Sequence, residues 1–148
     1  MVLTAMEFRR RFPAAATVIL TDRTYWVPTD RWLELWWAEL LAHQEWRPRR
    51  NGWRRLFGER MGKRPSPADC DDYALMGLAV ARQLYTARPP DDAEAPALAF
   101  AGGLIPDGKG TGHAMVAVAR GEGLALIEPQ AAALKLVEAT GVVRHVFG

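Results

Sequence analysis

The stretch that decides the fold is Ser66–Thr86, which reads SPADCDDYALMGLAVARQLYT. Ser66 has the character of a helix cap, and Pro67 follows at the first helical position. The sequence therefore predicts a helix that starts at Pro67 and runs through Cys70 to about Thr86. Its small residues at helical spacing are Cys70, Ala74, Gly77 and Ala81. Such a stripe lets a helix axis approach its neighbour closely, as a helix packed on a sheet requires.

Helical patterns also precede this stretch. Residues 4–7 read TAME, which has the spacing of a capping box and predicts a short helix that Pro13 ends. The clearest periodic helix begins at Thr29 or Asp30, and we expect it to end near Trp46. Its predicted buried face consists of Leu33, Trp36, Trp37, Leu40 and Leu41.

After residue 92 the pattern changes to short apolar runs separated by glycine and proline. The runs are Ala97–Ala101, His113–Ala119, Leu124–Ile127, Leu134–Val137 and Val142–Phe147. We interpret the glycines at 102–103 and 108–112 as turn residues, and the runs as strands of an antiparallel sheet. Helices first and strands later predict an α+β fold. We expect residues 1–148 to form one domain.

The composition limits the function classes. Apolar residues make up 49% and charged residues 24%, which is ordinary for a globular protein. The single cysteine, Cys70, excludes an internal disulfide framework and a cysteine-rich zinc site. No run approaches the ~18 apolar residues of a spanning helix, and the first residues lack a signal-peptide pattern. We therefore expect a cytoplasmic protein with no membrane partner.

Charge is concentrated in one segment, Arg47–Arg64. It holds eight basic residues and one acidic residue, so it carries +7 while the rest of the chain sums to −5. With Trp46, Trp53 and Phe57 this Arg/Trp-rich insertion, about residues 46–64, has the composition of a nucleic-acid contact. The alternative is a solvated basic loop whose aromatic residues anchor it to the domain.

Cys70, His113 and Glu128 have the residue types and the order of a cysteine-nucleophile site. Thiolate catalysis requires an activated cysteine, an imidazole within hydrogen-bond reach, and a third group that orients the imidazole. Cys70 lies in the first turn of a predicted helix, where unpaired backbone N–H groups favour a thiolate. His113 begins one predicted strand and Glu128 ends the next. Antiparallel pairing brings these two positions together, so Glu128 can meet His113.

Each of the three residues also has a structural interpretation. A lone cysteine is often a small buried apolar residue, although the acidic residues around Cys70 argue against that role here. His113 can be a hydrogen-bonded structural histidine, and Glu128 a surface charge at the end of a strand. The three residues together, in this order, favour the catalytic interpretation.

The motifs around these residues resemble a known family. They are Asp69-Cys70-Asp71-Asp72-Tyr73-Ala74, Gly112-His113-Ala114 and Ile127-Glu128-Pro129-Gln130. In this order the motifs are similar to those of the cysteine-peptidase domain at the C-terminus of fungal agglutinins, the chimerolectins. The chain also resembles small stand-alone relatives of that domain in phage-type genes. The likeness covers most of the sequence except about residues 46–64.

This resemblance implies a papain-like fold, a Cys–His–Glu triad and dependence on a divalent cation, usually calcium. By the same likeness the cation ligands would be among Asp71, Asp72, Glu128 and Gln130. Electrostatics supplies a reason for a cation. Each carboxylate beside Cys70 opposes a thiolate by about 3 kcal/mol at ~5 Å and an effective dielectric of ~20, before solvent screening.

The sequence thus predicts a cysteine peptidase or amidase that acts on a protein or peptide substrate. A transglutaminase-like acyl transferase is the nearest variant, because an amine can replace water in the second step. The alternative from another class is a catalytically silent papain-like scaffold that binds a host protein or nucleic acid through residues 47–64. Tyr25, Gln44 and Asn51 are equivalent candidates for a second oxyanion donor.

Overall fold

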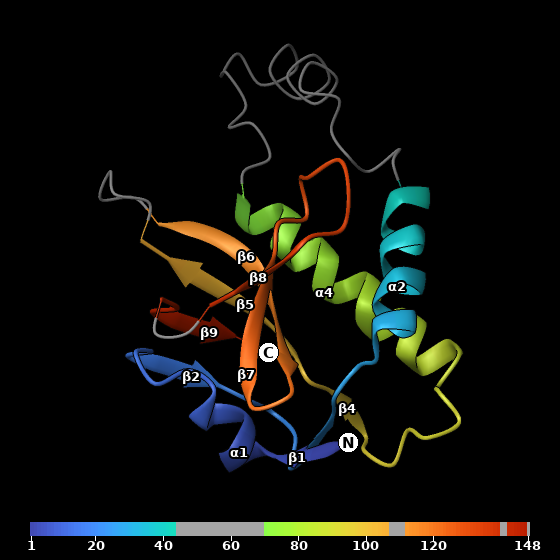
Figure 1. Cartoon of the computed structure of the whole chain (residues 1–148), viewed down its shortest axis with the longest axis horizontal. Helices are drawn as coiled ribbons and strands as arrows, with labels where there is room; N and C mark the ends of the chain where they lie inside the picture. The colour runs from blue at the N-terminus through green and yellow to red at the C-terminus, as the bar shows by residue number, and fades with distance from the viewer. Residues whose placement is uncertain (44–69, 107–111, 140–141, 148) are drawn as a thin grey trace, which may run out of the picture.

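The computed structural model describes residues 1–43, 70–106, 112–139 and 142–147, and Figure 1 shows the path of the chain. The described helices are α1 (Ala5–Arg10), α2 (Asp30–Ala42) and α4 (Cys70–Ala87). The strands are β1 (Val2–Thr4), β2 (Thr17–Ile19), β3 (Thr24–Trp26), β4 (Ala97–Leu98), β5 (Phe100–Ile105), β6 (His113–Arg120), β7 (Gly123–Ile127), β8 (Leu136–Glu138) and β9 (His145–Phe147). The fold is mixed α+β, as the sequence predicted. The cap predicted at 66–69 and the basic segment lie outside the described residues.

The described strands form a three-stranded sheet, β1-β3-β4, and a six-stranded sheet, β2-β9-β5-β6-β7-β8. The consecutive strands β5, β6, β7 and β8 pair antiparallel. The pair β5 with β9 is antiparallel as well, so the predicted antiparallel sheet of the C-terminal strands is confirmed for β5–β9. Two further pairs, β3 with β4 and β2 with β9, are parallel and were not predicted. Strands joined by a short hairpin must run in opposite directions, whereas these two pairs are joined across long stretches of chain and escape that constraint.

The predicted strand 97–101 is divided between the two sheets. Ala97 and Leu98 pair with β3, and Phe100 begins β5 in the other sheet. Ala99 links them: its N–H donates to the Trp26 carbonyl, and its own carbonyl accepts from the Ala119 N–H. One continuous apolar run therefore carries the chain from one sheet into the next.

Helix α4 packs on β5 and β6, and α2 packs on α4 (Figure 1). The predicted stripe of small residues is confirmed at Ala74 and Ala81, which are fully buried, and at Gly77, which is also buried and has no room for a side chain beside Val116 of β6. The predicted face of α2 is also confirmed. Its buried members are Leu33, Trp36, Trp37 and Leu40, with Leu41 partly buried and Trp32 added.

Helix α2 ends at Ala42, not near Trp46 as predicted. Its last position on the buried face is Leu41, and packing of that face supplies most of the stability of such a helix. At its other end Thr29 caps the helix through its side chain, which accepts from the Trp32 N–H. Asp30 in the first turn accepts a hydrogen bond from Arg120 at the end of β6, and this bond lowers the pKa of Asp30.

The side chains of β6 and β7 that face away from α4, among them Ala117 and Leu126, belong to a second cluster of buried apolar residues. Phe8 of α1 packs there against Tyr25 and Phe12. The capping box predicted for α1 is confirmed, since Thr4 and Glu7 exchange hydrogen bonds.

The interpretation of Gly102 and Gly103 as turn residues was wrong, because both lie inside β5. Phe147 of β9 lies directly opposite Gly102, and a Cβ atom at Gly102 would be 2.1 Å from that ring. The glycine therefore makes room for an aromatic side chain from a neighbouring strand. Gly112, by contrast, has a φ of +50°, a backbone conformation that favours glycine. The other glycines of that predicted turn, at 108 and 110, lie outside the described residues.

Within the described part of the chain, none of the helices has both the length and the apolar character needed to cross a membrane.

Candidate active site

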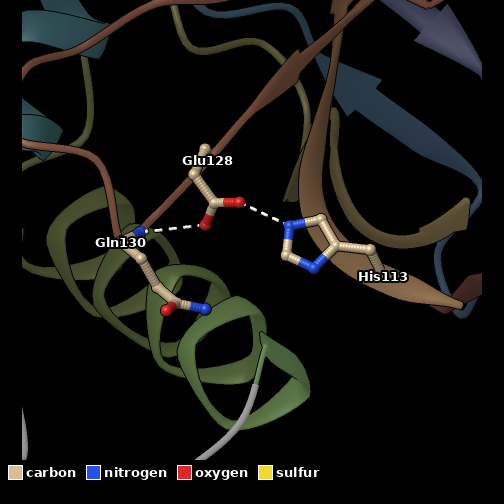
Figure 2. Close-up of polar contacts among 3 residues, drawn as sticks. All are labelled: His113, Glu128 and Gln130. Carbon is tan, nitrogen blue, oxygen red and sulfur yellow. Dashed lines mark hydrogen bonds and ion pairs between the residues drawn. The ribbon is translucent and has the colours of Figure 1, made fainter. Parts of the chain in front are cut away.

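His113 and Glu128 are in direct contact. The distance from His113 Nε2 to Glu128 Oε2 is 2.5 Å, and the two side chains are 33% and 31% exposed (Figure 2). His113 is the first residue of β6, and Glu128 follows directly after β7. The meeting of these two residues, predicted from antiparallel strand order, is thus confirmed as a contact.

The strand register explains this contact. β6 and β7 pair Ala117 with Leu126, and their ladder ends at Val116 and Ile127. If that register is continued, Glu128 falls opposite Met115, one diagonal step from His113. Diagonal neighbours on one sheet face lie within reach of long side chains. His113 and Glu128 therefore meet just beyond the last pair of the ladder.

A turn over residues 128–131 fixes the Glu128 carboxylate. The Ala131 N–H donates to the Glu128 carbonyl at 3.1 Å, with Pro129 at the second position, where its fixed φ suits such a turn. The Pro129 side chain is fully buried. The Gln130 N–H donates to Glu128 Oε1 at 3.0 Å (Figure 2). Each carboxylate oxygen therefore has its own hydrogen bond, and the carboxylate cannot rotate without losing one.

The carboxylate also decides which nitrogen of His113 carries the proton. A carboxylate only accepts hydrogen bonds, so Nε2 must be the protonated nitrogen of the neutral ring. The other nitrogen, Nδ1, lies on the side of the ring away from Glu128 (Figure 2). An unprotonated Nδ1 can accept a proton from a nucleophile.

Cys70 is the first residue of α4, and its side chain lies outside the described atoms. Later in the same helix Gly77 lies beside Val116 of β6, since a Cβ atom at Gly77 would be 2.8 Å from Val116 Cγ2. Cys70 is two helical turns before Gly77, about 10 Å at 1.5 Å per residue. His113 is three strand residues before Val116, also about 10 Å. Helix α4 and strand β6 begin at the same end of the molecule (Figure 1), so the starts of the two elements lie near each other.

The four cation ligands implied by the resemblance are only partly described. The Asp71 side chain lies outside the described atoms, and Asp72 is exposed. Glu128 and Gln130 are in contact, but through a backbone N–H donor, while the amide of Gln130 points away from the carboxylate (Figure 2). Among the described residues no group of three or more His, Cys, Asp or Glu side chains could hold a metal ion.

Of the three candidates for a second oxyanion donor, only Tyr25 is described, and it belongs to the core. Its hydroxyl accepts from the Asp22 N–H at 2.8 Å, and its side chain packs on Phe8. Burial raises the pKa of Tyr25. Gln44 and Asn51 lie outside the described residues.

Sequence reasoning missed the roles of Pro129 and of the Gln130 backbone. The signal was present, because proline at the second position of a turn leaves the N–H of the next residue free to meet the glutamate side chain.

Comparison with known proteins adds a likeness of fold. No family model matches the chain, and no curated protein is similar to it. The fold is similar to that of a solved structure described as a PSL1a–E64 complex, with a TM-score of 0.64 and 17% identity. The match covers 98% of this chain and 50% of that one, so the chain spans about half of the length of the solved protein. At this identity the likeness concerns the fold alone.

Proposed function

We propose that the chain is a papain-like cysteine hydrolase, a peptidase or amidase with Cys70 as nucleophile, His113 as base and Glu128 as the orienting group. The observation that carries the proposal is the contact of His113 Nε2 with a carboxylate whose other oxygen is already occupied by the Gln130 N–H. This arrangement leaves Nδ1 as the basic nitrogen. The same arrangement of imidazole and acidic group activates nucleophiles in unrelated hydrolases.

The reaction follows from these positions. Nδ1 takes the thiol proton from Cys70, and the thiolate attacks the carbonyl carbon of the substrate. The imidazolium then gives its proton to the leaving amine, and the C–N bond breaks to leave a thioester. Water attacks the thioester, with His113 accepting its proton, and the C–S bond breaks to release the acid product. The imidazolium then returns the proton to the Cys70 thiolate. An amine in place of water would give acyl transfer.

The single cysteine makes a direct test possible, because a thiol reagent can label only Cys70. The measurement is the rate of alkylation by iodoacetamide against pH, in the native chain and in His113→Ala. We expect fast labelling well below the free-thiol midpoint of ~8.5, and loss of that reactivity in the variant. E64, the compound named with the similar structure, is a second probe.

The matched control is Cys70→Ser, which should neither label nor hydrolyse an unstructured protein substrate. A labelling midpoint at or above ~8.5 that His113→Ala leaves unchanged would contradict the catalytic assignment. A normally folded chain with an inert Cys70 would instead favour the silent binding scaffold.

We further propose that a divalent cation, calcium by the resemblance, activates the site. Carboxylate and amide oxygens are the donors that calcium prefers, which suits Asp71, Asp72, Glu128 and Gln130 in kind. A bound cation would offset the negative charge beside Cys70. The test is labelling of Cys70 and hydrolysis in EDTA against millimolar calcium, with Asp72→Asn expected to raise the calcium requirement. Equal rates in both conditions would contradict this proposal and leave the acids as helix-capping residues.

A further inference from the structure

Gly77 lies where the elements of the candidate site meet. A Cβ atom placed on it would be 2.8 Å from Val116 Cγ2, 3.5 Å from Trp36 Cζ2 and 3.9 Å from Pro129 Cγ. The Gly77 carbonyl also accepts a hydrogen bond from Trp36 Nε1 at 2.9 Å, in a buried setting. Side chains from three other segments of the chain thus surround the place that a side chain at Gly77 would occupy.

Two of these three neighbours adjoin residues of the candidate site. Val116 lies three residues after His113 on the same strand, and Pro129 follows Glu128. Gly77 itself lies two turns after Cys70 on the same stripe of α4. Gly77 therefore lies where α4 approaches the segments that carry His113 and Glu128, and its carbonyl is bound by Trp36 of α2.

The contact leaves no room for a larger residue. A separation of 2.8 Å is well below the 3.5–4.0 Å at which carbon atoms pack, so a methyl group at Gly77 requires a shift of about 1 Å. Val116 cannot provide it easily, because its side chain is short, branched and fully buried. The helix must move away from β6, and Cys70 would move with it.

We propose that Gly77 is a positioning residue, which sets the spacing between the nucleophile-bearing helix and the pair His113–Glu128. This inference rests on the proposed function. A displacement of about 1 Å at a reacting group can cost about 100-fold in rate even when the mutation is distant from the chemistry.

The test compares Gly77→Ala, Val116→Ala and the double variant with the native chain. We expect Gly77→Ala to lower kcat/KM about 100-fold and to move the pH midpoint of Cys70 labelling toward that of a free thiol. Val116→Ala removes the atom that the new methyl group would meet. The double variant is therefore expected to recover the native pH profile and activity to within a few-fold.

The matched control is Val80→Ala, which removes buried volume from the same helix away from the site. It should lower Tm while leaving the labelling profile unchanged, so a shifted profile in Gly77→Ala reports position and not stability. If Gly77→Ala does not fold, Val116→Ile adds bulk from the strand side of the same contact and should shift the profile in the same direction.

The outcomes separate this inference from the proposed function. If Cys70 of the native chain labels as an ordinary thiol regardless of His113, the proposed function fails and takes the role of Gly77 with it. If the native chain shows an activated thiol but a folded Gly77→Ala keeps that profile and its activity within threefold, only the inference is overturned. Failure of the double variant to recover would also overturn it.

Discussion

Replacing Glu128 by glutamine tests how the site selects the tautomer of His113. The carboxylate accepts from His113 Nε2 and from the Gln130 N–H, at 2.5 Å and 3.0 Å. A glutamine side chain has one acceptor oxygen, and its other terminal atom is a donor. The Gln130 N–H can only donate, so the amide oxygen should turn toward it. The amide NH2 then donates to Nε2, and the ring proton moves to Nδ1, where it blocks the base.

Two contributions set the size of the loss of kcat/KM in Glu128→Gln. In the opposite orientation of the amide, its NH2 group would face the Gln130 N–H, so two donors would oppose each other. An unsatisfied donor costs about 1–3 kcal/mol, so the tautomer with the proton on Nδ1 is favoured by about 5- to 150-fold. Loss of the charge-assisted bond to the imidazolium removes about 1.5 kcal/mol, the lower end of the usual range, because the side chains are 33% and 31% exposed. That is about a further tenfold. We therefore expect kcat/KM to fall at least about 50-fold.

The assay is hydrolysis of an unstructured protein substrate at neutral pH, beside nitrogen NMR of the His113 ring. The ring proton should lie on Nε2 in the native chain and on Nδ1 in Glu128→Gln. Glu128→Ala is the matched comparison, because it removes the acceptor without placing the ring proton on Nδ1. It should retain at least as much activity as Glu128→Gln. Activity of Glu128→Gln within threefold of native, or a ring proton that stays on Nε2, would refute the reasoning.

Three other predictions concern stability, pH and the basic segment. Tyr85→Phe removes a buried hydrogen bond of 2.7 Å to the Ala95 carbonyl and should lower the free energy of unfolding by about 1–3 kcal/mol in urea titrations, whereas an unchanged midpoint would contradict this. Burial raises the pKa of Tyr25 and Tyr85, so the folded state favours the protonated form of both side chains. The stability that this contributes is fully present below pH ~10 and is lost as the pH rises through the pKa values of the folded state. Tyr85→Phe should therefore make the loss of stability at alkaline pH smaller. If Arg47–Arg64 binds nucleic acid through six or more phosphates, affinity should fall ~10³-fold between 50 and 200 mM salt, and absence of binding at low salt would leave it a solvated loop.

The local signals in the sequence predicted the local structure well. Thr4 and Glu7 form the expected capping box, and the small residues Ala74, Gly77 and Ala81 face the neighbouring elements. The contact of His113 with Glu128 could be predicted because consecutive strands joined by a short turn are antiparallel. Each of these features depends on residues close in sequence or on one hairpin.

The features that the sequence did not predict depend on distant partners. Gly102 lies within a strand because Phe147 covers it, and nothing near Gly102 indicates that ring. The change of sheet at Ala99 depends on the Trp26 carbonyl, which lies far away in the chain. In the site, the backbone donor of Gln130 was missed because its role depends on the turn around Pro129 and not on its side chain.

The parallel pairing of β2 with β9 has a consequence for the speed of folding. Thr17 pairs with His145, so this edge of the sheet closes a loop that contains every other element of the larger sheet. Closing such a long loop lowers the conformational entropy of the chain before the contacts between the two strands can compensate for it. This cost slows folding. The hairpin of β6 and β7, by contrast, turns at Gly121, whose φ of +48° suits a two-residue turn, and needs no distant partner. The strands that hold His113 and Glu128 can therefore pair quickly, while the rate of complete folding is set at the opposite edge of the sheet.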